Sequence, residues 1–334
     1  MKIAMDLRSI SRSGIGRYTR RLLRGLQHSY PNDEFIALED GVSIQWDSFL
    51  GRAQSGVQRL WWENVTLPRR IRAETVDVLH NPRNYGVPLY CSCPVVLTLH
   101  DVIPLSLSED CLTKWGTRSL YCALVGDAVH KAQRIITDSL YSADQIGRYF
   151  PGVLSKVEVI LLGVDSPVES AVTTKPVYDF PYVLTIGGSE ARKNVRRLIR
   201  AFLSMSSGIR GRHRLVVVGS TWRGYDLRNE FANSSQDIVF TGSLSDEELQ
   251  ALYRQSTVFA FPSLCEGFGL PVLEAMALGT PTICSNTSSL PEVAGDAALL
   301  FDPLDELSMA HALGRVLGSQ GLRSEMRLAG IGHS

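Results

Sequence analysis

Two glutamates separated by seven residues stand in a glycine-rich stretch, and their spacing suits the binding of hydroxyl groups. Pro271 is typical of a first helical turn and Gly279 of a helix end. Glu266 then precedes the helix, and Glu274 lies about one turn into it. A carboxylate beside the free N–H groups of a helix start can accept two hydrogen bonds from vicinal sugar or ribose hydroxyls. The alternative is a plain turn in which Glu274 only complements the helix dipole.

A basic turn with the sequence Glu190-Ala191-Arg192-Lys193-Asn194 follows a predicted strand. Asn194 is predicted to cap a helix over Val195–Met205. Arg192 and Lys193 then lie at the positive end of that helix, where two cations favour a diphosphate. For an isolated Arg-Lys pair, an exposed basic turn is the alternative.

Two glycines follow the first predicted strand of the chain. Gly14 and Gly16 could bring the backbone against a phosphate at a helix start. Thr19 stands where the full dinucleotide-binding fingerprint requires a third glycine, and this counts against a nicotinamide enzyme.

A histidine ends another predicted strand. His100, followed by Asp101, comes directly after an apolar run that begins at Val95. A histidine there can donate a hydrogen bond to a sugar hydroxyl or transfer a proton near neutral pH, and a purely structural histidine is the alternative. His80 and Asn81 end a further strand in the same way.

The overall composition excludes several partners. Lys plus Arg and Asp plus Glu both number 34, so no net field attracts nucleic acid. The six cysteines show no paired CxxC spacing, no D-x-D triplet occurs, and no His, Asp and Glu cluster has metal-ligand spacing. We therefore expect no dedicated metal and no other cofactor.

Charge and hydropathy predict a cytoplasmic protein, because the N-terminus is charged and no apolar run approaches about 20 residues. Basic helix faces could contact anionic lipid headgroups at the inner face of the membrane, and a solvated surface is the alternative. The arginines of these faces are Arg17, Arg20, Arg21, Arg24, Arg69, Arg70 and Arg72.

Short apolar runs alternate with helical patterns, which predicts two open α/β sheets in tandem. The predicted strands are Ile3–Leu7, Phe35–Leu38, Val76–His80, Val95–His100, Arg134–Thr137, Val157–Leu162, Tyr182–Ile186, Leu215–Val218, Ile238–Thr241, Val258–Phe261 and Thr282–Cys284. The aperiodic, proline-containing segment 166–181 is predicted to link a first domain over 1–165 to a second over 182–334. Open α/β sheets bind ligands outside the carboxyl ends of their strands, so we expect the site where the two sheets face each other.

Taken together, six stretches resemble the large family of retaining glycosyltransferases with the GT-B fold, family 4 and its relatives. The stretches are GIGRYTRRLL (14–23), LTLHDVIPL (97–105), IITDSLYSADQI (135–146), IGGSEARKNVRRLIRAF (186–202), IVFTGSLSDEELQALY (238–253) and EGFGLPVLEAMALGTP (266–281). The resemblance implies two doubly wound, Rossmann-like domains facing across a cleft, with the nucleotide sugar bound in the C-terminal domain and the acceptor on the N-terminal side.

The resemblance also implies a role for each candidate residue. Glu274 looks like the carboxylate that holds the nucleotide ribose, and Glu266 like the one that faces the transferred sugar. Lys193, with Arg192, resembles the pair that neutralises the leaving diphosphate. Many relatives carry an arginine where this chain has Gly188, so Arg192 is expected to serve instead. The other implied donor contacts are made by Gly14, Gly16, Gly188, Gly267, Phe268, Gly269, Leu270 and His100.

The function implied is transfer of a hexose, with retention, from a nucleotide diphosphate sugar to a glycan or lipid-linked saccharide acceptor in bacterial surface polysaccharide synthesis. The HDVIPL and GIGRYTRRLL stretches look most like bacterial mannosyltransferases, which favours GDP-mannose and leaves UDP-sugars open. Two alternatives are a GT-B nucleotide-sugar epimerase and a non-catalytic nucleotide-sugar-binding module. The second is considered because relatives continue into a final helix that crosses back onto the first domain, whereas this sequence ends at Ser334.

Overall fold

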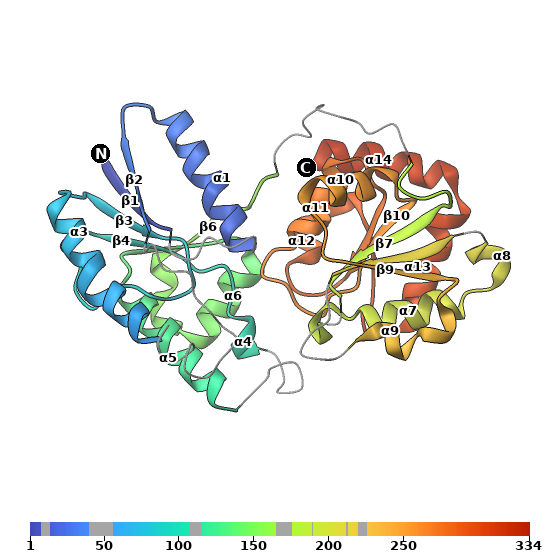
Figure 1. Cartoon of the computed structure of the whole chain (residues 1–334), viewed down its shortest axis with the longest axis horizontal. Coiled ribbons are helices and arrows are strands. Elements are labelled where there is room, and N and C mark those ends of the chain that lie inside the picture. Colours follow the sequence, from blue (N-terminus) through green and yellow to red (C-terminus); the bar gives the residue numbers. More distant parts are fainter. Residues whose placement is uncertain are drawn as a thin grey trace. The chain divides into compact units, whose positions relative to one another are not determined.

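The computed structural model describes residues 1–7, 14–39, 56–106, 115–164, 176–188, 190–211, 213–219 and 226–334. The chain divides into two compact units, Met1–Ile160 and Leu161–Ser334. Each unit contains a six-stranded sheet with helices packed against it (Figure 1).

The sheet of the first unit has the order β2-β1-β3-β4-β5-β6, and all its paired strands are parallel. Its strands are β1 (Lys2–Asp6), β2 (Glu34–Leu38), β3 (Val78–Asn81), β4 (Val95–Thr98), β5 (Arg134–Thr137) and β6 (Val157–Val159). The helical segments are α1 (Gly14–Ser29), a π-helical turn (Trp62–Thr66), α3 (Leu67–Ala73), α4 (Ile103–Ser106), α5 (Trp115–Lys131), α6 (Leu140–Tyr149) and a 3₁₀ turn (Pro151–Lys156). Parallel order places the carboxyl ends of all these strands at one edge.

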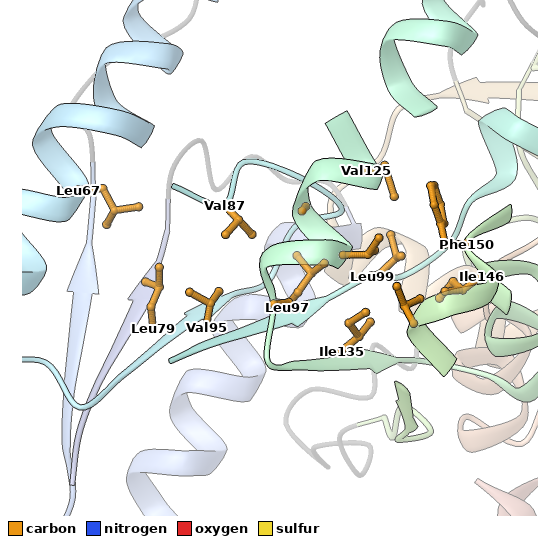
Figure 2. Close-up of a cluster of buried hydrophobic side chains, with 14 of the residues drawn as sticks. Leu67, Leu79, Val87, Val95, Leu97, Leu99, Val125, Ile135, Ile146 and Phe150 are labelled. Carbon is orange, nitrogen blue, oxygen red and sulfur yellow. The ribbon is translucent and has the colours of Figure 1, made fainter. Parts of the chain in front are cut away.

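Alternation along β4 separates the two faces of this sheet. Leu97 and Leu99 are buried in an apolar cluster together with Leu67 of α3 and Val125 of α5 (Figure 2). Thr98 points to the opposite face, where its hydroxyl meets Tyr18 of α1 at 3.2 Å. One face is therefore apolar and the other carries polar groups close to the strand ends.

The sheet of the second unit has the order β12-β11-β10-β7-β8-β9 and is also parallel in all its paired strands. The strands are β7 (Tyr182–Ile186), β8 (Arg214–Val218), β9 (Ile238–Gly242), β10 (Val258–Phe261), β11 (Thr282–Ser285) and β12 (Leu299–Phe301). The α-helices are α7 (Val195–Ser204), α8 (Ser207–Arg210), α9 (Leu227–Glu230), α10 (Asp246–Gln255), α11 (Leu270–Ala277), α12 (Leu290–Ala294), α13 (Glu306–Gly318) and α14 (Gln320–His333). Short 3₁₀ turns cover Ala191–Lys193, Ala232–Ser234 and Gly295–Ala297.

Both faces of the second sheet are apolar, which explains why its strands have continuous apolar sequences. Val183 of β7 packs with α7 and α13 on one face. Its neighbours Tyr182 and Leu184 pack with α10, α11 and α12 on the other. Helices on both sides of a parallel sheet define a doubly wound, Rossmann-like arrangement.

All eleven predicted strands are present, although β6 ends at Val159 rather than at Leu162. The sequence analysis missed β12, whose three residues Leu299–Phe301 are too few to show a period. Part of the predicted linker, residues 166–175, lies outside the described residues. Tyr178 and Phe180, at the end of the predicted linker, pack against the apolar core of the second unit.

Among the described residues, no helix combines the length and apolar composition needed to cross a bilayer.

Candidate functional site

The carboxylate of Glu266 is the centre of a buried ion cluster in the second unit. One oxygen lies 2.7 Å from Nζ of Lys193 and the other lies 2.8 Å from Nη1 of Arg192. The hydroxyl of Ser263 donates a further hydrogen bond to it over 2.5 Å. The side chains of Arg192, Lys193 and Glu266 are only 17%, 16% and 11% exposed, so water screens these charges weakly. The structure thus joins the basic turn to the first of the two predicted glutamates.

Three further contacts orient the cations of this cluster. Arg192 donates to the carbonyl oxygen of Cys265 over 2.6 Å and from Nε to Glu190 over 3.1 Å. Lys193 lies with its Nζ 5.0 Å from the centre of the Phe261 ring. Each cation is therefore held in place by groups other than Glu266, and can keep its position when an anionic ligand binds.

The expected capping role of Asn194 is wrong. Asn194 adopts a left-handed backbone conformation, with φ 56° and ψ 23°, and makes no side-chain cap hydrogen bond. Its side-chain amide instead donates to the carbonyl oxygens of Pro262 and Pro303, over 3.0 and 2.7 Å. A capping side chain requires an extended backbone at that residue, which Asn194 lacks. Asn194 therefore fixes the basic turn to the loop that contains Glu266.

The surroundings of Glu266 keep it ionised. Burial alone would raise its pKa, but the positive charges of Lys193 and Arg192 outweigh burial and lower the pKa below its usual value. Burial likewise opposes the charge on Arg192, and the negative charges of Glu266 and Glu190 raise the pKa of Arg192 above its ordinary value. Two cations and two carboxylates therefore face one another in a charge-balanced cluster.

The glycine-rich loop leads from β10 into α11 as predicted. Gly269 precedes the helix with a φ of 114°, and a Cβ atom there would lie 2.6 Å from the side chain of Leu290. The left-handed backbone favours glycine at this position, and a Cβ atom would in addition displace the end of the Leu290 side chain. Ser289 fixes the loop by donating to the carbonyl oxygens of Glu266 and Phe268, over 3.0 and 2.6 Å.

The remaining predicted residues of this loop have different surroundings. Glu274 is half-buried and begins the second turn of α11. The side chain of Phe268 is buried in the apolar core, and Leu270 packs partly buried against the same core. A donor contact at Phe268 would therefore involve its backbone.

Gly188 lies at the end of β7, but its N–H donates to the carbonyl oxygen of Val218 over 3.2 Å. A donor contact at Gly188 would then involve its Cα rather than its amide. Its neighbour Gly187 has a φ of 149°, and a Cβ there would lie 2.5 Å from the Cβ of Lys193. Gly187 thus makes room for the lysine side chain.

A second group of predicted residues belongs to the first unit. Nδ1 of His100 lies 2.6 Å from a carboxylate oxygen of Asp138, and Nε2 lies 3.4 Å from the carbonyl oxygen of Pro82. The ring of Tyr18 packs nearly perpendicular to the imidazole, with ring centres 4.8 Å apart. His80, the weaker candidate, shares a hydrogen bond of 2.8 Å with the hydroxyl of Thr98.

The two predicted glycines of the first unit open α1. Gly14 is the first residue of the helix and is exposed, whereas Gly16 is buried within the first turn. Thr19 uses its hydroxyl within the helix, donating to the carbonyl oxygen of Ile15 over 2.8 Å. Residues 8–13, which precede the glycines, lie outside the described ranges.

Sequence reasoning missed several residues that build these two groups. Asp138 directly follows β5, and its place after a buried strand was the signal that could have identified it. Ser263 and Ser289 have no such signal, because a serine becomes part of a site only when folding brings it to the right partner.

Because Glu266 forms ion pairs with both cations, its replacement should strengthen the binding of a diphosphate to them. We expect Glu266→Gln to tighten binding of GDP by about tenfold, equivalent to about 1.4 kcal/mol, as measured by titration calorimetry. Glu230→Gln is the matched control, since Glu230 also bridges two basic side chains, Arg196 and Arg200, but does so at the surface. Weaker GDP binding by Glu266→Gln would show that Glu266 does not compete with the diphosphate.

Comparison with known proteins defines the class of this fold. A sucrose-phosphate synthase from Thermosynechococcus elongatus superimposes with a TM-score of 0.74 at 18% identity, covering 100% of this chain and 94% of that chain. Two Rossmann-like units with this similarity define a GT-B fold.

Family models identify the family as well. The model described as Glycosyltransferase Family 4 matches residues 12–166, and the model described as Glycosyl transferases group 1 matches residues 173–332. The chain belongs to glycosyltransferase family 4.

Two curated relatives are mannosyltransferases by name. The O-antigen chain mannosyltransferase B of Escherichia coli is 36% identical over 254 residues, which are 71% of this chain and 65% of the relative. The MMP alpha-(1->4)-mannosyltransferase of Mycolicibacterium hassiacum is 51% identical over 267 residues, which are 73% of this chain and 62% of the relative. The chain thus spans less than two thirds of the length of either relative.

Proposed function

We propose that the protein transfers a mannosyl residue from GDP-mannose, with retention, to a glycan or lipid-linked saccharide in the synthesis of a bacterial surface polysaccharide. The observation that carries this proposal is the buried cluster of Lys193, Arg192 and Glu266 beside the start of α11. The names of the two mannosyltransferase relatives support the choice of sugar.

In the proposed reaction, Lys193 and Arg192 stabilise the negative charge that builds on the departing diphosphate. Preorganised charges of this kind act most strongly where water is excluded, and both side chains are largely buried. We propose that no dedicated metal is required, because Lys193 and Arg192 together stabilise the diphosphate. The acceptor hydroxyl attacks the same face of an oxocarbenium-like sugar, and no protein nucleophile takes part.

Glu266 and Glu274 divide the recognition of the donor in this proposal. Glu266 lies within the ion cluster and accepts hydrogen bonds from hydroxyls of the transferred sugar. Glu274 accepts hydrogen bonds from the ribose hydroxyls of the nucleotide. Glu266 thus binds the sugar that is transferred, and Glu274 binds the nucleotide that leaves.

A thermal-shift screen of GDP-, UDP-, ADP- and dTDP-sugars tests the donor class. A ligand present at about 100 times its Kd stabilises the folded state by about 2.7 kcal/mol, which is readily measured as a rise in Tm. We expect GDP-mannose to give the largest rise, and release of GDP in the presence of a saccharide acceptor to follow. A larger rise with a UDP-sugar would contradict GDP-mannose, and interconversion of sugar epimers without acceptor would contradict transfer.

We also propose that the first unit contacts anionic lipid at the membrane surface, close to lipid-linked acceptors. Five exposed apolar side chains, which we call the Trp61 patch, lie in two segments that flank α3 in the sequence: Val57, Leu60, Trp61, Leu89 and Tyr90. Asn64 joins its two segments by accepting the N–H of Leu89 over 2.9 Å, and Arg72 lies 5.9 Å from the ring of Tyr90. Aromatic rings beside arginines suit the interface of an anionic bilayer.

Co-sedimentation with vesicles tests this contact. We expect binding to vesicles that contain phosphatidylglycerol and not to pure phosphatidylcholine, and Trp61→Ala should weaken it several-fold because an interfacial ring is lost. Leu328→Ala removes an equally exposed apolar side chain from α14 and should leave binding unchanged. Equal binding to both vesicle types would contradict the proposal.

A further inference from the structure

Both ring nitrogens of His100 face groups that can only accept hydrogen bonds. Nδ1 meets the carboxylate of Asp138 at 2.6 Å, and Nε2 meets the carbonyl oxygen of Pro82 at 3.4 Å. A neutral imidazole carries one N–H and would leave one of these acceptors opposite a nitrogen lone pair. Only the doubly protonated imidazolium donates to both.

The backbone on either side of this pair is fixed. The N–H of His100 donates to the side chain of Asn84 over 3.0 Å, and its carbonyl oxygen accepts from the hydroxyl of Ser142 over 3.0 Å. Ser139, next to Asp138, caps α6 by accepting the N–H of Ser142 over 3.0 Å. The short contact between His100 and Asp138 is therefore imposed by β4, β5 and α6 together.

The charged groups around His100 favour one positive charge at this position. Two carboxylates face His100: Asp138, which directly follows the neighbouring strand β5, and Asp101, the next residue in the sequence. Burial alone would lower the pKa of His100, but the hydrogen bond and the charge of Asp138 outweigh burial and raise it. Burial lowers the pKa of His80 to about 4, with the charge on His100 adding to the effect, so His80 stays neutral.

Tyr18 of α1 packs against the imidazole and contributes no charge. Burial raises the pKa of Tyr18 to about 12, and its hydroxyl shares a hydrogen bond of 3.2 Å with Thr98. The same Thr98 hydroxyl meets His80 at 2.8 Å. The positive charge of this group therefore lies on His100, because His80 is neutral and Tyr18 keeps its hydroxyl proton.

We propose that Asp138 is a positioning residue that keeps His100 protonated, so that Nε2–H can donate a hydrogen bond to an oxygen of the nucleotide-sugar donor. At 3.4 Å the bond to Pro82 is long, and a ligand oxygen can replace it at little cost. A protonated donor forms a stronger, charge-assisted bond to a hydroxyl or phosphate oxygen than a neutral imidazole does. The role in donor binding rests on the proposed function, whereas the charge state of His100 does not.

The first test is the protonation of His100 itself, which needs no activity. Correlation spectra of the histidine ring nitrogens, recorded on the full chain across a pH series, distinguish the imidazolium from either neutral tautomer. In the unmodified protein we expect His100 to titrate above the usual histidine value. Titration of His100 below pH 6 would overturn the proposal, even if every variant failed to fold.

Asp138→Asn then tests the cause. The variant keeps the shape of the side chain and removes its charge, so His100 should titrate at least about one pH unit lower than in the unmodified protein. The control is Asp144→Asn, because Asp144 pairs with Arg148 on the exposed face of α6 and does not touch His100. An unchanged titration of His100 in Asp138→Asn would overturn the proposal.

The pH profile of transfer separates positioning from a merely structural role. The basic limb of kcat/KM should move to lower pH in Asp138→Asn by the same amount as the titration of His100. A shift of one unit corresponds to a loss of about tenfold at pH 8 and a smaller loss at pH 6. A loss that is equal at all pH values would overturn the positioning role. Absence of transfer by the unmodified protein would instead contradict the proposed function and leave the titration result standing.

Discussion

Lys193→Ala is expected to lower kcat for glycosyl transfer by about 10²–10³-fold, with a smaller effect on KM. The ammonium group of Lys193 is fixed by Glu266 at 2.7 Å and lies over the ring of Phe261. It is therefore preorganised to meet negative charge that develops on the leaving diphosphate and is weaker in the ground state. An interaction stronger in the transition state than in the bound substrate acts on kcat.

Steady-state kinetics with saturating donor measures this effect, and Lys131→Ala is the control. Lys131 forms an exposed ion pair with Asp127 on α5 at 2.6 Å, and such pairs contribute at most about 1 kcal/mol. Loss of Lys193 also leaves Glu266 with one fewer partner, so a lower Tm is expected without loss of the fold. A kcat within threefold of the value for the unmodified protein would show that Lys193 does not stabilise the transition state.

Glu274→Ala is expected to reduce kcat/KM for the donor by about 10²–10⁴-fold. Two hydrogen bonds from ribose hydroxyls to a carboxylate contribute about 1.5–3 kcal/mol each. Unlike Lys193, the proposed ribose contact exists in the bound substrate as well as in the transition state, so the loss should fall mainly on KM. Glu274 is half-buried at the second turn of α11, and alanine favours a helix, so the variant should stay folded.

Donor binding measured by calorimetry gives an independent readout of the Glu274 contact. The affinity for GDP should fall in Glu274→Ala, whereas it should rise in Glu266→Gln, and the opposite signs separate the two carboxylates. Glu325→Ala on α14 removes an exposed carboxylate from the same unit and should change neither value. Full activity of Glu274→Ala would exclude the ribose contact.

Local pattern was sufficient to predict eleven of the twelve strands in the described part of the chain. Continuous apolar runs predict buried parallel strands wherever four or more residues carry the pattern, as in β7 and β10. The three residues of β12 fall below that limit, and their pairing with β11 decides that they form a strand. Asn194 was misread because its residue type favours both a cap and the left-handed region, and only the contacts with Pro262 and Pro303 select between them.

By itself, the sequence determined which residue types stand at the carboxyl ends of strands and at helix starts. Hydrophobic periodicity and the positions of turn-forming residues are local properties of the sequence. Glu266, Lys193 and His100 could be named on that basis. Only the tertiary structure decided which of them touch. The ion pair between Lys193 and Glu266 joins positions 73 residues apart, and His100 meets Asp138 across 38. Strand order sets such pairings, and strand order depends on how the whole sheet buries its faces, which no short stretch of sequence encodes.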